Sequence, residues 1–338
     1  MSRITIAEIA RHAGVSRGTV DRALHNRGEI NPEVRERVIR SAKILGYPLK
    51  AAPNQRKIGI LLPGGSWFDR YLKETWKQGV ADASALLESL GYRILLQECE
   101  TSESGEMAAQ ILAMEEQGVS GLILTARDEP QIRSLVNSLA DRNIPTITYN
   151  SDISSRRSAY VGQDPYKSGR VAGDIYVKYA EPDRRVLVIA GNLAFTGHRR
   201  RVQGFLDKCV ERGIDRTQIR IEESNNEYEL TREKVLAAFR EDARISAVYM
   251  ANESISGCVD ALRELELTER VLVIGNDLTA GTRSMLMEGS VNFIVEQNIY
   301  WQGYRPLILM KHLLESPDAS TEEDRFTHIR VANRETVR

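Results

Sequence analysis

Residues 5–28 read TIAEIARHAGVSRGTVDRALHNRG, and this stretch decides how the first part of the chain folds. Thr5 and Glu8 have the spacing of a capping box, in which the hydroxyl and the carboxylate satisfy free backbone N–H groups at the start of a helix. Gly14 can end that helix in the left-handed conformation, and Ser16 can cap the next one. The segment that connects the two helices is so short that the chain must turn sharply there.

A third helix is expected directly afterwards. Asn31 and Pro32 form an N-cap followed by proline at the first helical position, and apolar residues then recur at helical spacing up to Gly46. Two helices joined by a tight turn and supported by a third form a helix-turn-helix, whose second helix can enter the major groove of DNA. Packing of the apolar residues would leave these positions of the second helix facing the bases: Arg17, Gly18, Asp21 and Arg22.

The charge of the chain is strongly divided. Residues 1–57 carry twelve Lys and Arg against five acidic residues, a net charge of +7, whereas the rest of the chain carries −8. A basic head on an acidic body is the pattern of a segment that neutralises phosphates. A three-helix module that binds other proteins would show similar helices, and the divided charge favours DNA over that alternative.

Several stretches of the head carry a family resemblance: residues 4–10, 13–24, 35–38 and 45–47. Together they resemble the DNA-binding head of the LacI/GalR transcriptional repressors. The resemblance implies that Arg17 and Gly18 occupy the two base-reading positions at the start of the recognition helix, and that Arg22 is the third residue facing the groove. It further implies that the following residues contact phosphates of the DNA backbone: Thr5, Ser16, Thr19 and Asn26.

Two positions of the recognition helix limit how bases can be read. The family commonly has Ser where this chain has Asp21, and an acid there repels phosphate unless it pairs with an arginine or accepts from a cytosine amino group. Gly18 has no side chain to contribute. Base readout would therefore rest mainly on Arg17 and Arg22, each of which can bond guanine through two hydrogen bonds.

The linker between head and body departs from the family. In the resembled family, a short helix in this region folds on operator DNA and inserts a Leu into the minor groove. Here Pro53 would fall in the middle of such a helix, where proline lacks an N–H and clashes with the preceding turn. Leu49 remains a candidate wedge, but a short extended tether is favoured. We expect a helix-turn-helix DNA-binding domain at 1–48, a linker at 49–56 and an effector-binding body at 57–338.

From the end of the linker onward, buried-looking β runs alternate with amphipathic helices, which is the pattern of parallel α/β layers. About 280 residues are enough for two lobes, each with its own core. The expected fold class is therefore α/β, with an all-α helix-turn-helix head followed by two doubly wound parallel-sheet lobes. We assign 57–162 plus 298–320 to the first lobe, and 163–297 plus 321–338 to the second.

Ligands of open parallel sheets bind beyond the carboxyl ends of the strands, so the residues that follow each expected strand are candidates for a binding site. Polar and aromatic side chains gather there, as a closed cleft for a polyol needs, because every buried polar group requires a partner. A single Asn or Asp in such a place can instead be a turn former or a helix cap. The candidates of the first lobe are Trp67, Phe68, Asp69, Thr125 and Asn150.

The body also resembles the type I periplasmic-binding-protein fold that LacI/GalR members carry, in its ribose-binding-like branch. Local matches place these residues where that branch has its ligand-binding side chains: Arg201, Asn252, Asp277 and Gln297. Asn150 stands where many sugar binders have Asp, which leaves the identity of the sugar open. The basic run 198–201 opens a helix beside the cleft, so a sugar phosphate or a sugar acid stays an alternative.

No catalytic pattern competes with this interpretation. The glycine-containing stretch 191–197 is followed by His rather than by Lys and Ser or Thr, so it is not a phosphate-binding P-loop. The five His residues are scattered, and the three Cys have neither metal-ligand nor redox spacing. We expect no enzymatic activity, no cofactor and no metal. The three Cys show no pairing pattern. The chain also shows no apolar signal segment and no apolar run long enough to span a bilayer, so we expect a cytoplasmic protein.

The sequence therefore predicts a transcriptional repressor whose binding to operator DNA is controlled by a small-molecule effector, a sugar or sugar derivative. A homodimer is expected because one helix-turn-helix covers only a half-site of a palindromic operator. Release of DNA on effector binding is favoured over corepression. The alternative from another class is a cytoplasmic sugar-binding or sugar-modifying protein without operator-specific DNA binding.

Overall fold

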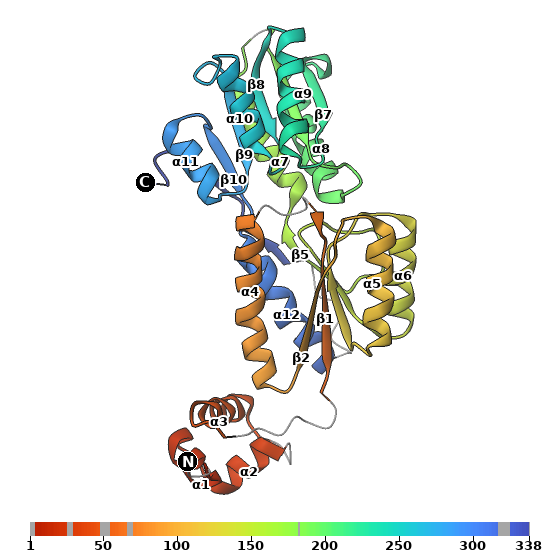
Figure 1. Cartoon of the computed structure of the whole chain (residues 1–338), viewed down its shortest axis with the longest axis vertical. Helices are drawn as coiled ribbons and strands as arrows, with labels where there is room; N and C mark the ends of the chain where they lie inside the picture. The colour runs from red at the N-terminus through yellow and green to blue at the C-terminus, as the bar shows by residue number, and fades with distance from the viewer. Residues whose placement is uncertain are drawn as a thin grey trace.

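The computed structural model describes residues 4–25, 30–47, 55–65, 70–181, 183–316 and 325–337. A small helical head lies at one end, and two α/β lobes stacked end to end form the body (Figure 1). Within these residues, each lobe is built around one six-stranded sheet. The mixed class and the two parallel-sheet lobes that the sequence predicts are confirmed.

The head contains the three expected helices, α1 (Ile6–Ala13), α2 (Arg17–His25) and α3 (Pro32–Ile44). The capping box is present, because the Glu8 carboxylate accepts from the Thr5 N–H (2.7 Å) and the Thr5 hydroxyl accepts from the Glu8 N–H (3.4 Å). Gly14 ends α1 with φ of 65°. One apolar cluster holds the helices together and includes Ile9, Ala10, Ala13, Val20, Ala23, Val38 and Ala42.

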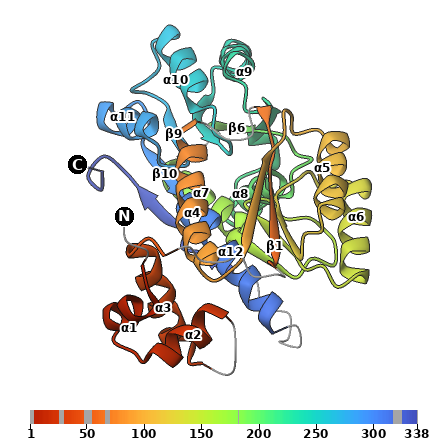
Figure 2. The same ribbon diagram turned by 60° about the horizontal axis from the view of Figure 1, so that its bottom comes forward.

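The head lies beyond the end of the first lobe that faces away from the second lobe (Figures 1 and 2). Helix α3 approaches helix α4 (Arg70–Ser89) of the body there. Of the expected linker 49–56, only Gln55 and Arg56 belong to the described residues. Gln55 donates through Nε2 to the Tyr92 carbonyl, and Arg56 donates to the Leu314 carbonyl, so the end of the linker is fixed on the first lobe.

The first lobe has a wholly parallel sheet in the order β11-β5-β4-β3-β1-β2. Helices α4 and α12 (Ile299–Glu315) pack on one face of this sheet, and α5 (Ser104–Glu116) and α6 (Pro130–Asp141) pack on the other (Figure 1). The strands are β1 (Lys57–Leu62), β2 (Arg93–Glu98), β3 (Gly121–Leu124), β4 (Thr146–Tyr149), β5 (Ala159–Gln163) and β11 (Arg325–Thr327).

The second lobe repeats this plan with the order β12-β10-β9-β8-β6-β7, in which only the edge strand β12 is antiparallel among the described strands. Helices α7 (Pro165–Tyr179) and α8 (Thr196–Glu211) cover one face, and α9 (Tyr228–Glu241), α10 (Ile255–Glu264) and α11 (Ala280–Glu288) cover the other. The strands are β6 (Arg185–Ala190), β7 (Ile219–Glu223), β8 (Ile245–Met250), β9 (Leu272–Asn276), β10 (Phe293–Glu296) and β12 (Arg330–Ala332).

The chain passes between the lobes after β5, after β10 and after β11. The last passage differs from our expectation, which placed 321–338 wholly in the second lobe. Strand β11 instead pairs in parallel with β5 and completes the sheet of the first lobe. A strand of three residues is too short to show a periodic pattern, and its partner β5 lies far away in the sequence. The other two passages lie between Gln163 and Pro165 and between Glu296 and Ile299.

The two lobes share a way of packing neighbouring helices. Gly79 of α4 and Gly303 of α12 each face the backbone of the other helix so closely that an added Cβ would overlap a carbonyl oxygen. Gly169 of α7 and Gly204 of α8 form the same reciprocal contact in the second lobe. Both helix pairs therefore depend on the absence of a side chain where the backbones meet.

In the described part of the chain, no helix has both the length and the apolar character that crossing a membrane requires.

Candidate functional site

The outer face of α2 is polar, and its inner face is packed. Arg17, Gly18 and Arg22 are exposed, whereas Val20 and Ala23 are buried against α1 and α3. The face that the sequence assigns to the bases is therefore turned away from the core of the head. Arg22 donates through Nε to the Gly18 carbonyl at 3.3 Å, which holds the guanidinium along the helix.

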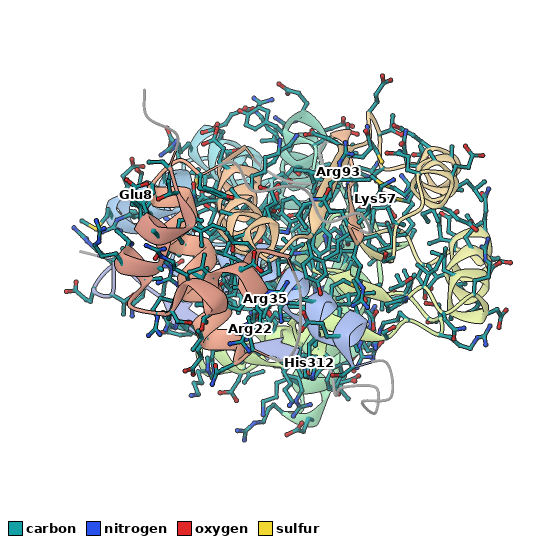
Figure 3. The ribbon with its side chains drawn as sticks, turned by 90° about the horizontal axis from the view of Figure 1, so that it is seen from below. Glu8, Arg22, Arg35, Lys57, Arg93 and His312 are labelled. Carbon is teal, nitrogen blue, oxygen red and sulfur yellow. The ribbon has the colours of Figure 1, made fainter. Side chains whose placement is uncertain are left out.

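Hydroxyl groups gather at the start of the same helix. The Thr19 N–H donates to the Ser16 hydroxyl oxygen (3.1 Å), and the two hydroxyls lie 2.9 Å apart. Free N–H groups and hydroxyls at a helix start form a site for phosphate oxygens. Arg22 and Arg35 both belong to this end of the molecule, seen from below in Figure 3. Asn26, which the sequence adds to the phosphate contacts, lies outside the described residues.

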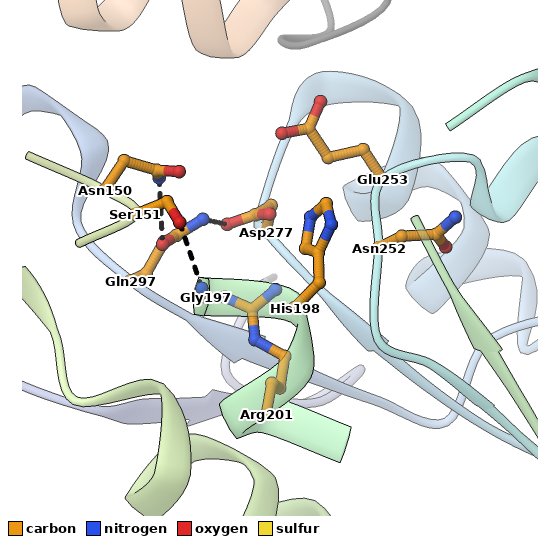
Figure 4. A pocket seen from close by; sticks show the side chains of 9 residues that line it. All are labelled: Asn150, Ser151, Gly197, His198, Arg201, Asn252, Glu253, Asp277 and Gln297. Carbon is orange, nitrogen blue, oxygen red and sulfur yellow. Dashed lines mark hydrogen bonds between the residues drawn. The ribbon is translucent and has the colours of Figure 1, made fainter. Parts of the chain in front are cut away.

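A small cavity lies where the strand ends of the two lobes meet (Figure 4). Its free volume is about 10 Å³, close to the space of a single water molecule. The first lobe supplies residues from the loop after β4, and the second supplies residues from α8 and from the loops after β8, β9 and β10. The lining residues are Asn150, Ser151, Gly197, His198, Arg201, Asn252, Glu253, Asp277 and Gln297.

Two residues that line this cavity, Arg201 and Asn252, each have one buried polar atom without a partner among the described residues. Arg201 is 6% exposed, donates through Nη1 to the Ala251 carbonyl (3.1 Å), and has no partner for Nε. Asn252 is 1% exposed, and its Nδ2 donates to the hydroxyls of Ser224 and Ser254 while Oδ1 has no partner. Among the described residues, each of these two buried side chains is held in place and lacks one hydrogen bond.

A chain of amides and one carboxylate joins the lobes across the cavity. Gln297 donates through Nε2 to Asp277 Oδ1 (2.6 Å), and Gln297 Oε1 accepts from Asn150 Nδ2 (3.3 Å). Gln302 also accepts from Asn150 Nδ2 at 3.2 Å. Asn150 and Asp277 both have positive φ, 59° and 70°, which Asn and Asp adopt more readily than most residues. Their tight turns aim both side chains at Gln297.

Direct contacts between the lobes keep the cleft closed. The Gly197 N–H at the start of α8 donates to the Ser151 hydroxyl at 3.0 Å. The Asp128 N–H donates to the Ala194 carbonyl (3.1 Å), and Arg199 lies 3.6 Å from the Asp128 carboxylate. Burial opposes ionisation of Asp128, yet its bonds from Ser154 and the charge of Arg133 lower the pKa of that carboxyl. Asp128 is therefore a charged anchor for the arginine of the opposite lobe.

A larger cavity of about 370 Å³ adjoins the small one. It lies between the loops after β1, β2 and β3 of the first lobe and the loops after β6 and β7 of the second. Arg127 forms part of its wall, donates two hydrogen bonds to Glu103 (2.9 and 2.6 Å), and stands 5.9 Å from the centre of the Phe195 ring. No sequence pattern pointed to Arg127, because nothing in its local sequence links it to the other lobe.

His198 occupies the boundary between the two cavities. Burial, and then the charge of Arg201, lower the pKa of this imidazole to about 4, while its contact with the backbone of Asn192 opposes the shift. The ring is therefore uncharged at neutral pH. The described residues contain no group of side chains that could hold a metal ion.

The structure brings together most of the side chains that the sequence assigned to the ligand. Thr125 lies behind the cavity instead, where its hydroxyl bonds the backbone of Ser151 and shapes the loop after β4. Trp67, Phe68 and Asp69 lie outside the described residues. Sequence reasoning did not name Ser151, which follows β4, and it placed Gly197, His198 and Glu253 only within the polar stretches 196–201 and 252–253 beside the chosen residues. The predicted residues that meet at the small cavity are Asn150, Arg201, Asn252, Asp277 and Gln297.

Comparison with known proteins gives two matching family models. Residues 63–318 match the periplasmic binding protein domain, and residues 5–48 match the bacterial regulatory proteins of the lacI family. MalI, the maltose regulon regulatory protein of Vibrio furnissii, is 36% identical over 136 residues, which cover 38% of this chain and 94% of MalI. CelR, an HTH-type transcriptional regulator of Thermobifida fusca, is 26% identical over 293 residues, which cover 81% of this chain and 82% of CelR.

Among solved structures, the body is similar to GanP, a glucose-galactose binding protein from Geobacillus stearothermophilus. The TM-score is 0.74 at 22% sequence identity, and the match covers 83% of this chain and 98% of GanP. At this identity the likeness shows the fold of the two lobes.

Proposed function

The chain belongs to the lacI family of bacterial regulatory proteins, with a periplasmic binding protein domain as its body, and from this premise we propose how its two sites work together. The protein is a DNA-binding transcriptional regulator. We propose that a sugar or sugar derivative binds between the two lobes and controls the affinity of the head for operator DNA. The regulator acts as a repressor, and the effector releases it from the operator.

The observation that carries the proposal is that two residues lining the closed cleft each have one buried polar atom without a partner among the described residues. Arg201 Nε is a donor and Asn252 Oδ1 is an acceptor. Neither atom has a hydrogen-bond partner among the described residues. Leaving a buried polar group unpaired costs about 1–3 kcal/mol, so a ligand that fills both gaps gains binding energy. A hydroxyl group both accepts and donates, and neighbouring hydroxyls on a sugar ring can serve both residues.

The charges around the small cavity favour an uncharged effector. Asp277 and Glu253 contribute carboxylates, Arg201 contributes one cation, and His198 is neutral at physiological pH. A sugar phosphate or sugar acid would bring further negative charge to a site that already holds more carboxylates than cations. GanP is described as binding the neutral sugars glucose and galactose, which supports the same choice for this fold.

Gln297 gives the effector a route to the head. It bonds Asp277 of the second lobe and Asn150 of the first, and its carbonyl accepts from the Thr327 hydroxyl (2.9 Å) and from Gln302 Nε2 (3.0 Å). Gln297 therefore belongs both to the cavity and to the place where the chain passes between lobes. An effector that rearranges these bonds changes the angle between the lobes, and the first lobe carries the head.

We propose that the regulator works as a cytoplasmic homodimer. One recognition helix reads only a half-site, and two-fold symmetry matches a palindromic operator. Rotation of the first lobes against each other then alters the distance between the two heads. Light scattering should give the mass of a dimer.

Thermal-shift measurements with neutral sugars, sugar phosphates and sugar acids test the effector class, because a ligand that binds only the folded state raises the melting temperature. We expect a neutral sugar to stabilise the protein and to weaken operator binding in a fluorescence-anisotropy assay. Arg201→Met should abolish both effects, while Arg200→Met, a change of the exposed neighbour on α8, should preserve them. A response to phosphorylated or acidic sugars alone would overturn the choice of a neutral effector.

A further inference from the structure

His198 is the only described residue that lines both the small cavity of about 10 Å³ and the larger cavity of about 370 Å³. Figure 4 shows its ring standing between Asp277 and Asn252. The small cavity has room for a water molecule or a hydroxyl group but not for a sugar ring. The larger one falls within the range of about 300–1,000 Å³ that is usual for small-molecule sites. The imidazole is thus the wall between a polar recess and a chamber of ligand size.

The ring is fixed from two sides. His198 Nδ1 lies 3.0 Å from the Asn192 N and 3.1 Å from the Asn192 carbonyl oxygen, so the backbone of Asn192 holds this ring nitrogen in either tautomer. Gly191 lies against the ring so closely that an added Cβ would overlap His198 Cε1. The Phe195 ring meets the imidazole edge-on with 6.1 Å between centroids. A side chain held in this way is a rigid wall, and it does not turn aside for a ligand without breaking these contacts.

We propose that His198 divides one effector site into two compartments and thereby sets the size of the sugar that the regulator accepts. The sugar ring lies in the larger chamber, and one hydroxyl-bearing edge reaches past His198 to Arg201 and Asn252. This inference rests on the proposed function, since it assigns the size limit of the same site. Removal of the imidazole joins the compartments, so that the selectivity for ligand size changes along with the affinity.

Calorimetric titration of the full chain with ribose, glucose, maltose and cellobiose tests the proposal. We expect wild type to bind a monosaccharide more tightly than either disaccharide. In His198→Ala, the ratio of monosaccharide to disaccharide affinity should fall at least tenfold. His312→Ala removes an exposed histidine on α12, outside both cavities, and should leave the ratio unchanged. Melting curves of each variant verify that it is folded.

A second pair of variants tests the seating of the ring. Gly191→Ala should weaken sugar binding at least tenfold in wild type, because the new methyl group displaces the imidazole. In the His198→Ala background, the fold loss of sugar affinity caused by Gly191→Ala should be at least three times smaller. Part of the loss should remain, because the Asn226 side chain also lies near position 191. Equal losses in the two backgrounds would contradict the seating.

The outcomes separate this inference from the proposed function. If wild type binds a sugar but His198→Ala weakens all four by the same factor, or leaves all four unchanged, the partition is overturned and the proposed function stands. If wild type binds no sugar in this panel or in the wider thermal-shift panel, the sugar proposal is overturned and the partition with it. A change in the ratio of monosaccharide to disaccharide affinity in His198→Ala, but not in His312→Ala, supports the partition.

Discussion

Gly169 of α7 lies against the backbone carbonyl of Arg201 in α8, so closely that a Cβ at position 169 would overlap the carbonyl oxygen. Gly204, one turn further along α8, makes the reciprocal contact with the carbonyl of Tyr166. The depth at which α8 sits on α7 therefore determines where the buried guanidinium of Arg201 stands in the cleft. A packing contact outside the cavity thus sets the geometry of the effector site.

Gly169→Ala should reduce effector affinity at least tenfold, because α8 must move away and carry Arg201 with it. Overpacking of this kind also costs stability, about 1–3 kcal/mol in the free energy of unfolding. Gly79→Ala introduces the same overlap in the first lobe, against the Tyr300 carbonyl, and is the matched control. Calorimetric titration and melting curves should show both variants less stable but only Gly169→Ala impaired in binding. Equal losses of affinity would contradict the proposed positioning role.

Arg22→Ala should remove discrimination among operator variants while effector binding stays intact. The side chain is on the exposed face of α2, and one arginine bonded to guanine through two hydrogen bonds is worth about 1–3 kcal/mol of discrimination. The measurement is fluorescence anisotropy with an operator and a set of single-base variants. Arg212→Ala, an exposed arginine on the second lobe, controls for the loss of charge. An unchanged order of preference among the operators would refute the assignment of Arg22.

Sequence reasoning reached those parts of the site that depend on strand direction. Asn150, Asp277 and Gln297 each follow a parallel strand, and the carboxyl ends of parallel strands meet at one edge, so their convergence was predictable before the structure was known. Arg127 was not predictable, and for His198 the sequence indicated only a basic run beside the cleft, because the contacts of both residues come from loops far apart in sequence. The pairing of β11 with β5 escaped prediction for the same reason.

Ser151→Ala should shift the body away from the closed conformation. The hydroxyl of Ser151 accepts the Gly197 N–H across the cleft, and the variant leaves that N–H without its acceptor. The loss of one hydrogen bond costs about 1 kcal/mol, or about fivefold in effector affinity. Small-angle X-ray scattering should show a larger radius of gyration for the variant than for wild type. Ser284→Ala, on the exposed side of α11, should behave as wild type, and a similar loss in both variants would exclude a specific role for Ser151.

Stability should depend on pH through His198. Its pKa is lowered to about 4 in the folded protein, chiefly by burial, from 6.5 when the chain is unfolded. Between these values the unfolded state binds the extra proton, so the free energy of unfolding decreases as the pH falls through this range. From pH 7 to pH 5 the expected decrease attributable to this group is roughly 1–2 kcal/mol. His198→Asn offers an acceptor for the Asn192 N–H but does not titrate, so urea unfolding of this variant should show a flatter pH dependence. The same slope in wild type and variant would mean that other groups control stability between these pH values, and that the imidazole is protonated in the folded state as easily as in the unfolded chain.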